Sequence, residues 1–82
     1  MDPFLKIEFF DFLKIQLAIA IGPIAEYIIK DELQKFGSDF TRFPRDRVAE
    51  LVGLLSRQIR RPEKKLAFER EMLKKIQEAA IG

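Results

Sequence analysis

The 82-residue sequence predicts an all-α fold, a compact bundle of four helices in a single domain that covers residues 1–82. Apolar residues recur at three- and four-residue intervals over most of the chain, which is the spacing of helices with one buried face. Each of the four prolines stands where a helix can begin, because the first helical N–H has no intrahelical partner to lose. A chain of this length has room for one hydrophobic core.

The first expected helix covers residues 3–20, with Asp2 as its cap and Pro3 at its first position. Residues 4–21 are apolar on nearly every face, and they also alternate with the period of a strand. We favour a helix because residues 9–12, Phe-Phe-Asp-Phe, contain no turn chemistry for a hairpin. An isolated hairpin without further strands is also marginal. A strand-like segment stays the alternative.

The other three helices are expected at residues 23–36, 44–60 and 62–80. Each has an apolar stripe at helical spacing and begins at a proline. Gly37 follows the second helix at the position that favours a left-handed residue. Asp46 falls in the first turn of the third helix, where an acidic residue complements the helix macrodipole.

The sequence contains no His and no Cys. Zinc and other transition-metal sites therefore lack their usual ligands, and Ser–His or Cys–His nucleophile pairs cannot form. Carboxylate pairs remain for acid–base catalysis, but scattered acidic residues are ordinarily surface residues. We therefore expect a protein that is not an enzyme and that binds neither a metal nor a cofactor.

Location follows from the same composition. A small secreted domain usually needs disulfides, so the absence of Cys favours a reducing, cytoplasmic location. The first residues lack the basic start of a signal peptide. The longest run without strongly polar residues, 17–25, is far shorter than the roughly 20 residues that span a membrane. No membrane span is expected.

A structural corner is expected at Gly22 and Pro23. Gly22 can adopt a positive φ while Pro23 fixes its own φ, which gives a sharp bend between two apolar helices. Ala25 is small and lets another helix approach closely.

The Gly22-Pro23-Ile24-Ala25 string with its apolar lead-in resembles the hallmark of an uncharacterised bacterial helical domain. That domain is commonly attached to the C-terminal end of signalling proteins such as response regulators and Ser/Thr kinases. The similarity covers about residues 17–73 and includes Asp31-Glu32, Phe43-Pro44, Glu50-Leu51 to Leu55, Ile59 and Phe68. The family has no catalytic residues to carry over. The resemblance implies an accessory module for protein interaction or oligomerisation.

The candidate sites are surfaces that are not needed to form the hydrophobic core. A first helix that is apolar all round is difficult to bury in a small monomer, so its surplus face is a candidate interface. We expect a protein partner, with a homodimer favoured. The interface candidates are Phe4, Phe9, Phe10, Phe12 and Ile19.

A basic edge is the second candidate surface. It consists of Arg42, Arg45, Arg57, Arg60, Arg61, Lys64 and Lys65. This edge is compatible with a solvated surface, with docking of an acidic protein surface, or with phosphate contacts to a nucleic acid. Acidic residues along the fourth helix disfavour a nucleic-acid backbone, and no aromatic residues are placed to stack on bases. Nucleic-acid binding is therefore the alternative function.

Overall fold

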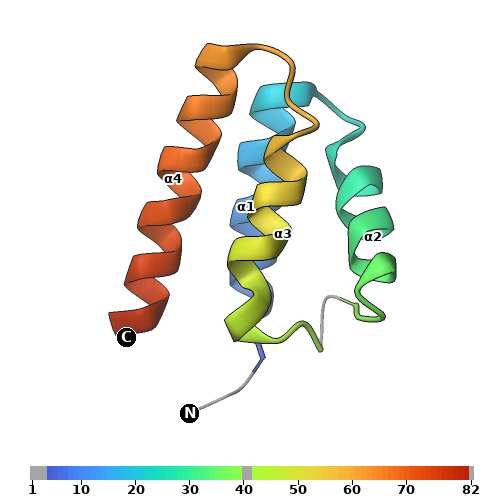
Figure 1. The fold of residues 1–82 in the computed structure, drawn as a ribbon, viewed down its shortest axis with the longest axis vertical. Coiled ribbons are helices and arrows are strands. Elements are labelled where there is room, and N and C mark those ends of the chain that lie inside the picture. Colours follow the sequence, from blue (N-terminus) through green and yellow to red (C-terminus); the bar gives the residue numbers. More distant parts are fainter. Residues whose placement is uncertain (1–3, 40–41, 82) are drawn as a thin grey trace.

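The computed structural model describes residues 4–39 and 42–81, with 79–81 described as backbone only. The elements are α1 (Ile7–Ile21), α2 (Ala25–Lys35), the short 3₁₀ helix η1 (Arg45–Arg47), α3 (Val48–Ser56) and α4 (Pro62–Ile81). Successive α-helices run in opposite directions (Figure 1). α1 and α3 each pack against both α2 and α4. The predicted all-α four-helix bundle is confirmed, and the strand alternative is wrong for residues 7–21.

The first helix begins at Ile7, later than predicted. The Leu5 N–H donates to the carbonyl oxygen of Phe43 (3.0 Å), and Phe4 forms an isolated antiparallel bridge with Pro44. These contacts join segments far apart in the sequence and hold the chain before α1 in an extended conformation, with Lys6 at φ −75° and ψ 154°. Asp2 and Pro3, the predicted cap and first helical position, lie outside the described residues.

The second helix starts two residues later than predicted and ends at Lys35, one residue before the predicted end. Pro23 and Ile24 form a turn, so α2 begins at Ala25. At the other end Gly37 has a φ of 70°. The Ser38 N–H donates to the Leu33 carbonyl oxygen (3.0 Å), and the Gly37 N–H donates to that of Gln34 (2.9 Å). This pattern is a Schellman motif, which satisfies carbonyl groups that the helix end leaves unpaired.

The third predicted helix, 44–60, is shorter in the structure. Its first turn is the 3₁₀ helix η1, and α3 ends at Ser56. The Gln58 N–H donates to Leu55 (3.0 Å) and the Ile59 N–H to Ser56 (3.1 Å), so the helix closes with i→i+3 bonds. Ile59 is 4% exposed. α4 begins at Pro62, and a proline disfavours the helical conformation at the residue before it, here Arg61.

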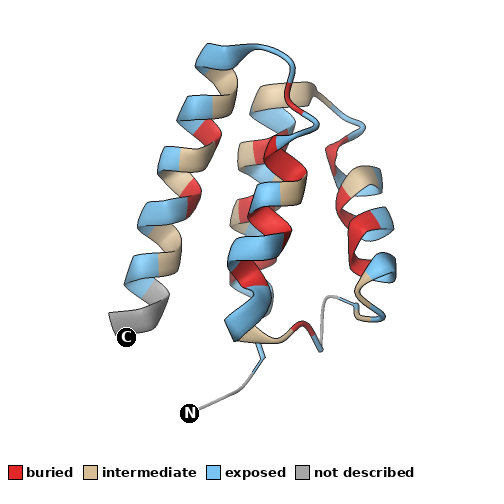
Figure 2. Cartoon of the chain, viewed as in Figure 1, coloured by how far each residue is buried: buried red, intermediate tan, exposed pale blue. Residues whose placement is uncertain are grey.

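The hydrophobic core lies between the four α-helices (Figure 2). Every α-helix contributes side chains to it, and so does the segment that precedes η1. The largest fully buried side chains are Phe10, Leu13, Leu17, Ile29, Leu33, Phe43, Leu51, Leu55, Phe68 and Met72. The order of the helices in space is therefore fixed by apolar packing.

Gly53→Ala should stabilise the domain by about 0.5–1 kcal/mol. Gly53 lies inside α3, is exposed, and has no atom within 4 Å of the position that a Cβ would occupy. Alanine therefore gains helix propensity and restricts the unfolded chain without a clash. Thermal unfolding followed by circular dichroism measures the change. A lower midpoint for the variant would contradict this prediction.

Candidate functional site

An exposed row of side chains runs along α1. Ile7, Asp11, Ile15 and Ile19 are spaced by four residues, so they form one ridge on the helix surface, here called the α1 ridge. The three isoleucines are 56%, 58% and 65% exposed in chain order. The opposite face of the same helix is buried in the core through Phe9, Phe10, Leu13 and Leu17. α1 therefore presents apolar side chains to the core and to the surface.

Of the five predicted interface residues, two are wrong. Phe9 is 5% exposed and Phe10 is completely buried. Their rings meet edge to face with centroids 6.0 Å apart, and Phe10 meets Phe43 in the same way at 6.2 Å. These contacts turn both rings into the core.

The other three predicted interface residues reach the surface to different extents. Ile19 belongs to the α1 ridge, and Phe4 is 39% exposed. Phe12 is half-buried, and the Lys75 Nζ lies 5.2 Å from its ring centroid in a cation–π contact. Ile7 and Ile15 were missed by sequence reasoning. Their four-residue spacing from Ile19 is the signal that could have indicated them.

Charged side chains flank the α1 ridge. The Lys64 Nζ, on α4, donates to the carbonyl oxygen of Ile19 (3.5 Å). The last turn of α1 has no basic residue of its own, so this lysine supplies the cation that complements the negative end of the helix macrodipole. Along the boundary with α2, Lys14 forms an ion pair with Glu26 (3.7 Å). Lys64 therefore lies beside the α1 ridge at the C-terminal end of α1.

The predicted corner is present between α1 and α2. Gly22 has φ 88° and ψ −162°, which confirms the positive φ. Its N–H donates to the Ala18 carbonyl oxygen (2.8 Å), and its own carbonyl oxygen accepts from the Ala25 N–H (3.1 Å). Pro23 is exposed, whereas Ala25 is 2% exposed and belongs to the core. The corner is a structural element between two packed helices.

The predicted basic edge is divided by the structure into two groups. Arg42 and Arg45 precede α3, whereas the residues of the other group follow it (Figure 1). A nine-residue helix such as α3 separates its ends by about 13 Å. The second group, here called the basic end, consists of Arg57, Arg60, Arg61, Lys64 and Lys65. Among the described residues, no carboxylate lies within ion-pair distance of any of these five side chains.

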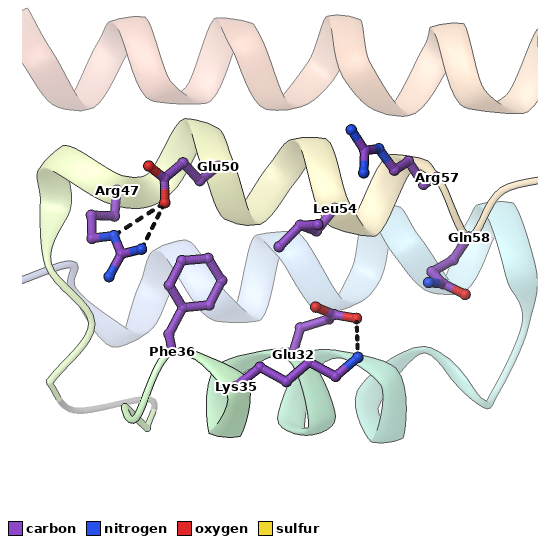
Figure 3. Close-up of a pocket in the computed structure, with 8 residues that line it drawn as sticks. All are labelled: Glu32, Lys35, Phe36, Arg47, Glu50, Leu54, Arg57 and Gln58. Carbon is purple, nitrogen blue, oxygen red and sulfur yellow. Dashed lines mark hydrogen bonds and ion pairs between the residues drawn. The ribbon is translucent and has the colours of Figure 1, made fainter.

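An open groove of about 520 Å³ lies between α2 and α3 (Figure 3). Its lining consists of Glu32, Lys35, Phe36, Arg47, Glu50, Leu54, Arg57 and Gln58. The Arg47 guanidinium donates to Glu50 from Nε (3.1 Å) and Nη2 (2.9 Å), and it lies 4.6 Å from the Phe36 ring centroid. Most charges of the groove are therefore paired within it.

Glu32 is the one buried carboxylate of the groove among the described residues, at 5% exposure. It accepts a hydrogen bond from the Lys35 Nζ (3.3 Å). This bond, together with the charges of Glu32 and Asp31, raises the pKa of Lys35 above its ordinary value of 10.5. Because the folded-state pKa is the higher one, the pairing stabilises the fold at neutral pH and is lost as the pH rises past that pKa.

Two other kinds of site are absent from the described part of the chain. Within residues 4–39 and 42–81, no three acidic side chains gather in a way that could hold a metal ion. No helix in that part of the chain is both long and apolar enough to cross a bilayer.

Residues 8–81 match the family described as "Domain of unknown function (DUF8082)". The chain belongs to this family. The match includes most of α1, the Gly22–Pro23 corner and α2 to α4. No curated protein and no solved structure matches the chain significantly.

Proposed function

We propose that this member of the DUF8082 family is a non-catalytic protein-interaction module that forms a homodimer through the α1 ridge. The α1 ridge is the observation that carries the proposal, because three large isoleucines stand more than half exposed on a helix whose other face already fills the core. Burial of such a side chain against a partner contributes about 1.5–3 kcal/mol when it is complete. An exposed apolar row of this kind is typical of a protein-binding surface.

The proposed setting is an accessory module of bacterial signalling proteins in the cytoplasm. The sequence resemblance and the absence of Cys support this setting. In such a protein the catalytic or receiver part would lie elsewhere in the chain. The module would bring two copies of that part together.

Ile15→Glu should convert the dimer to a monomer and leave the helical content unchanged. The side chain at position 15 is 58% exposed, so glutamate remains hydrated in the monomer but must lose water in the dimer. Size-exclusion chromatography with light scattering at tens of micromolar measures the mass.

Leu73→Glu is the matched control for this experiment. Leu73 lies on α4 with 56% exposure and takes the same change from apolar to acidic away from the α1 ridge. It should keep the dimer mass. A monomeric wild-type chain, or equal masses for Ile15→Glu and wild type, contradicts the proposed function.

Nucleic-acid binding through the 42–65 region stays the alternative hypothesis. The basic end supports it, since five basic side chains there have no carboxylate partner among the described residues. Separation of Arg42 and Arg45 from this group disfavours one continuous phosphate-binding edge. Binding that weakens with salt, and that is lost on Arg60→Glu with Arg61→Glu, would support the alternative. Absence of a mobility shift at low salt would exclude it.

A further inference from the structure

We propose that the second copy binds the α1 ridge in an antiparallel orientation, about a two-fold axis at Ile15. Asp11 of each copy then faces Lys64 of the other. This inference rests on the proposed function, which makes a second copy the partner. What it adds is the orientation of the two chains and the charged contacts that select it.

The exposed face of α1 is acidic toward its N-terminal end. Glu8 and Asp11 are both exposed, and no described basic side chain lies within ion-pair distance of either. At the opposite end the Lys64 ammonium group lies against the Ile19 carbonyl oxygen, 3.5 Å away. An ammonium group has three N–H donors, so this contact leaves others for a partner carboxylate. One face therefore carries opposite charges at its two ends.

This charge distribution selects the antiparallel orientation. Parallel association about a two-fold axis places Asp11 level with its own copy, and like charges repel. Antiparallel association places the acidic end of each helix at the lysine end of the other. The helix macrodipoles also oppose each other in that arrangement, which is favourable.

The spacing along the α1 ridge sets the register. Asp11 and Ile19 are each four residues from Ile15, so an axis through Ile15 brings Asp11 level with Ile19 of the second copy. Lys64 lies at that level because of its contact with Ile19. Ile15 then meets its own symmetry copy, as in an isologous interface. Ala18, exposed beside the ridge, leaves room for a side chain of the facing ridge.

Two lysines that contact side chains on or beside α1 are already paired and do not oppose this orientation. Lys75 lies over the Phe12 ring and forms an ion pair with Glu78 (3.7 Å). Lys14 pairs with Glu26 (3.7 Å). The Lys75–Glu78 pair is neutral. Glu26 also pairs with Lys30 (3.5 Å), so the Lys14 group keeps a positive charge, but Lys14 is adjacent to Ile15 at the axis and favours neither orientation.

Two further acidic residues on α4 lie near this face. Glu71 falls between Lys64 and Lys75, hence close to the middle of α1, where it favours neither orientation. Glu63 is adjacent to Lys64, but the basic end as a whole keeps a positive balance. Lys6 precedes α1 next to Glu8, so Asp11 and Lys64 are the charges on which the choice of orientation is tested.

Charge reversal at the two positions tests the inference. Asp11→Lys alone and Lys64→Glu alone should each weaken self-association by roughly tenfold, because both contacts of each homodimer then join like charges. An equal mixture of the two variants should form a mixed dimer with an affinity near that of wild type, because both contacts again join opposite charges. Native mass spectrometry resolves the mixed dimer, and sedimentation gives its affinity.

Matched controls use the same charge changes away from α1. Asp46→Lys on η1 and Arg70→Glu on α4 alter exposed residues and should leave dimerisation unchanged, alone or mixed. Lys64→Glu also removes the contact to Ile19, so circular dichroism must show a folded chain. If it does not, Lys64→Gln replaces it, and the mixture with Asp11→Lys should still favour the mixed dimer.

The outcomes separate this inference from the proposed function. If Ile15→Glu is monomeric but the mixture shows no preference for the mixed dimer, the antiparallel orientation is overturned and the α1 interface stands. Preferential pairing of Asp11→Lys with wild type indicates the parallel orientation and also overturns it. A wild-type chain that is monomeric overturns both proposals.

Discussion

Phe10→Ala should lower the free energy of unfolding by about 3–5 kcal/mol. Phe10 is completely buried, and its ring meets Phe9 at 6.0 Å and Phe43 at 6.2 Å between centroids. Phe43 in turn meets Phe36 at 5.2 Å. The Phe10 ring therefore packs directly against the segment before η1, at Phe43. Through Phe43 it is also connected to Phe36 at the end of α2. A whole domain has about 5–15 kcal/mol of stability, so the variant should be close to unfolding at 37 °C.

Urea unfolding followed by circular dichroism measures this loss. Leu73→Ala serves as its control, because the side chain removed there is apolar but 56% exposed on α4, away from the α1 ridge. That change should stay within about 0.5 kcal/mol of wild type. Equal midpoints for the two variants would show that the Phe10 ring does not join these elements as the structure indicates.

The turns between the helices were the part of the fold that the local sequence could predict. The Pro and Gly positions act through backbone geometry alone, so Gly22, Gly37 and Pro62 mark their turns whatever the rest of the chain does. The apolar stripes of three segments, together with the nearly all-apolar first segment, likewise predict four helices. Contacts between distant segments lay beyond this reasoning, and the start of α1 shows why. The Leu5–Phe43 hydrogen bond holds a segment extended that local pattern assigns to a helix.

Selection of the exposed face of α1 was the part of the candidate site that sequence could not settle. The helix is apolar nearly all round, so its own periodicity does not say which stripe enters the core. Phe43 decides this by packing with Phe10, and Phe36 packs in turn against Phe43; neither belongs to α1. Large aromatic side chains gain the most free energy from burial. This favours burial of the face that carries Phe9 and Phe10 over the face that carries Ile7 and Ile15.

Gly22→Ala should lower the free energy of unfolding by about 1–3 kcal/mol. At φ 88° and ψ −162° the backbone lies in a region that residues with a Cβ scarcely enter. No atom lies within 4 Å of the position that a Cβ would occupy. The loss therefore comes from backbone conformation and not from a steric clash, and repacking of neighbours cannot relieve it. Thermal unfolding of the two chains measures it.

Substituting asparagine at each of the two positive-φ glycines tests whether the loss at Gly22 comes from its particular backbone conformation or from a need for glycine at any positive φ. Gly37 has a φ of 70° in a Schellman motif, a left-handed conformation that asparagine tolerates. Gly37→Asn should therefore change stability by less than about 1 kcal/mol, while Gly22→Asn should be nearly as destabilising as Gly22→Ala. Equal losses for the two asparagine variants would contradict the conformational explanation. The Gly22 result also bears on dimerisation, because this corner ends α1 beside Ile19 and Lys64, where the second copy is proposed to bind.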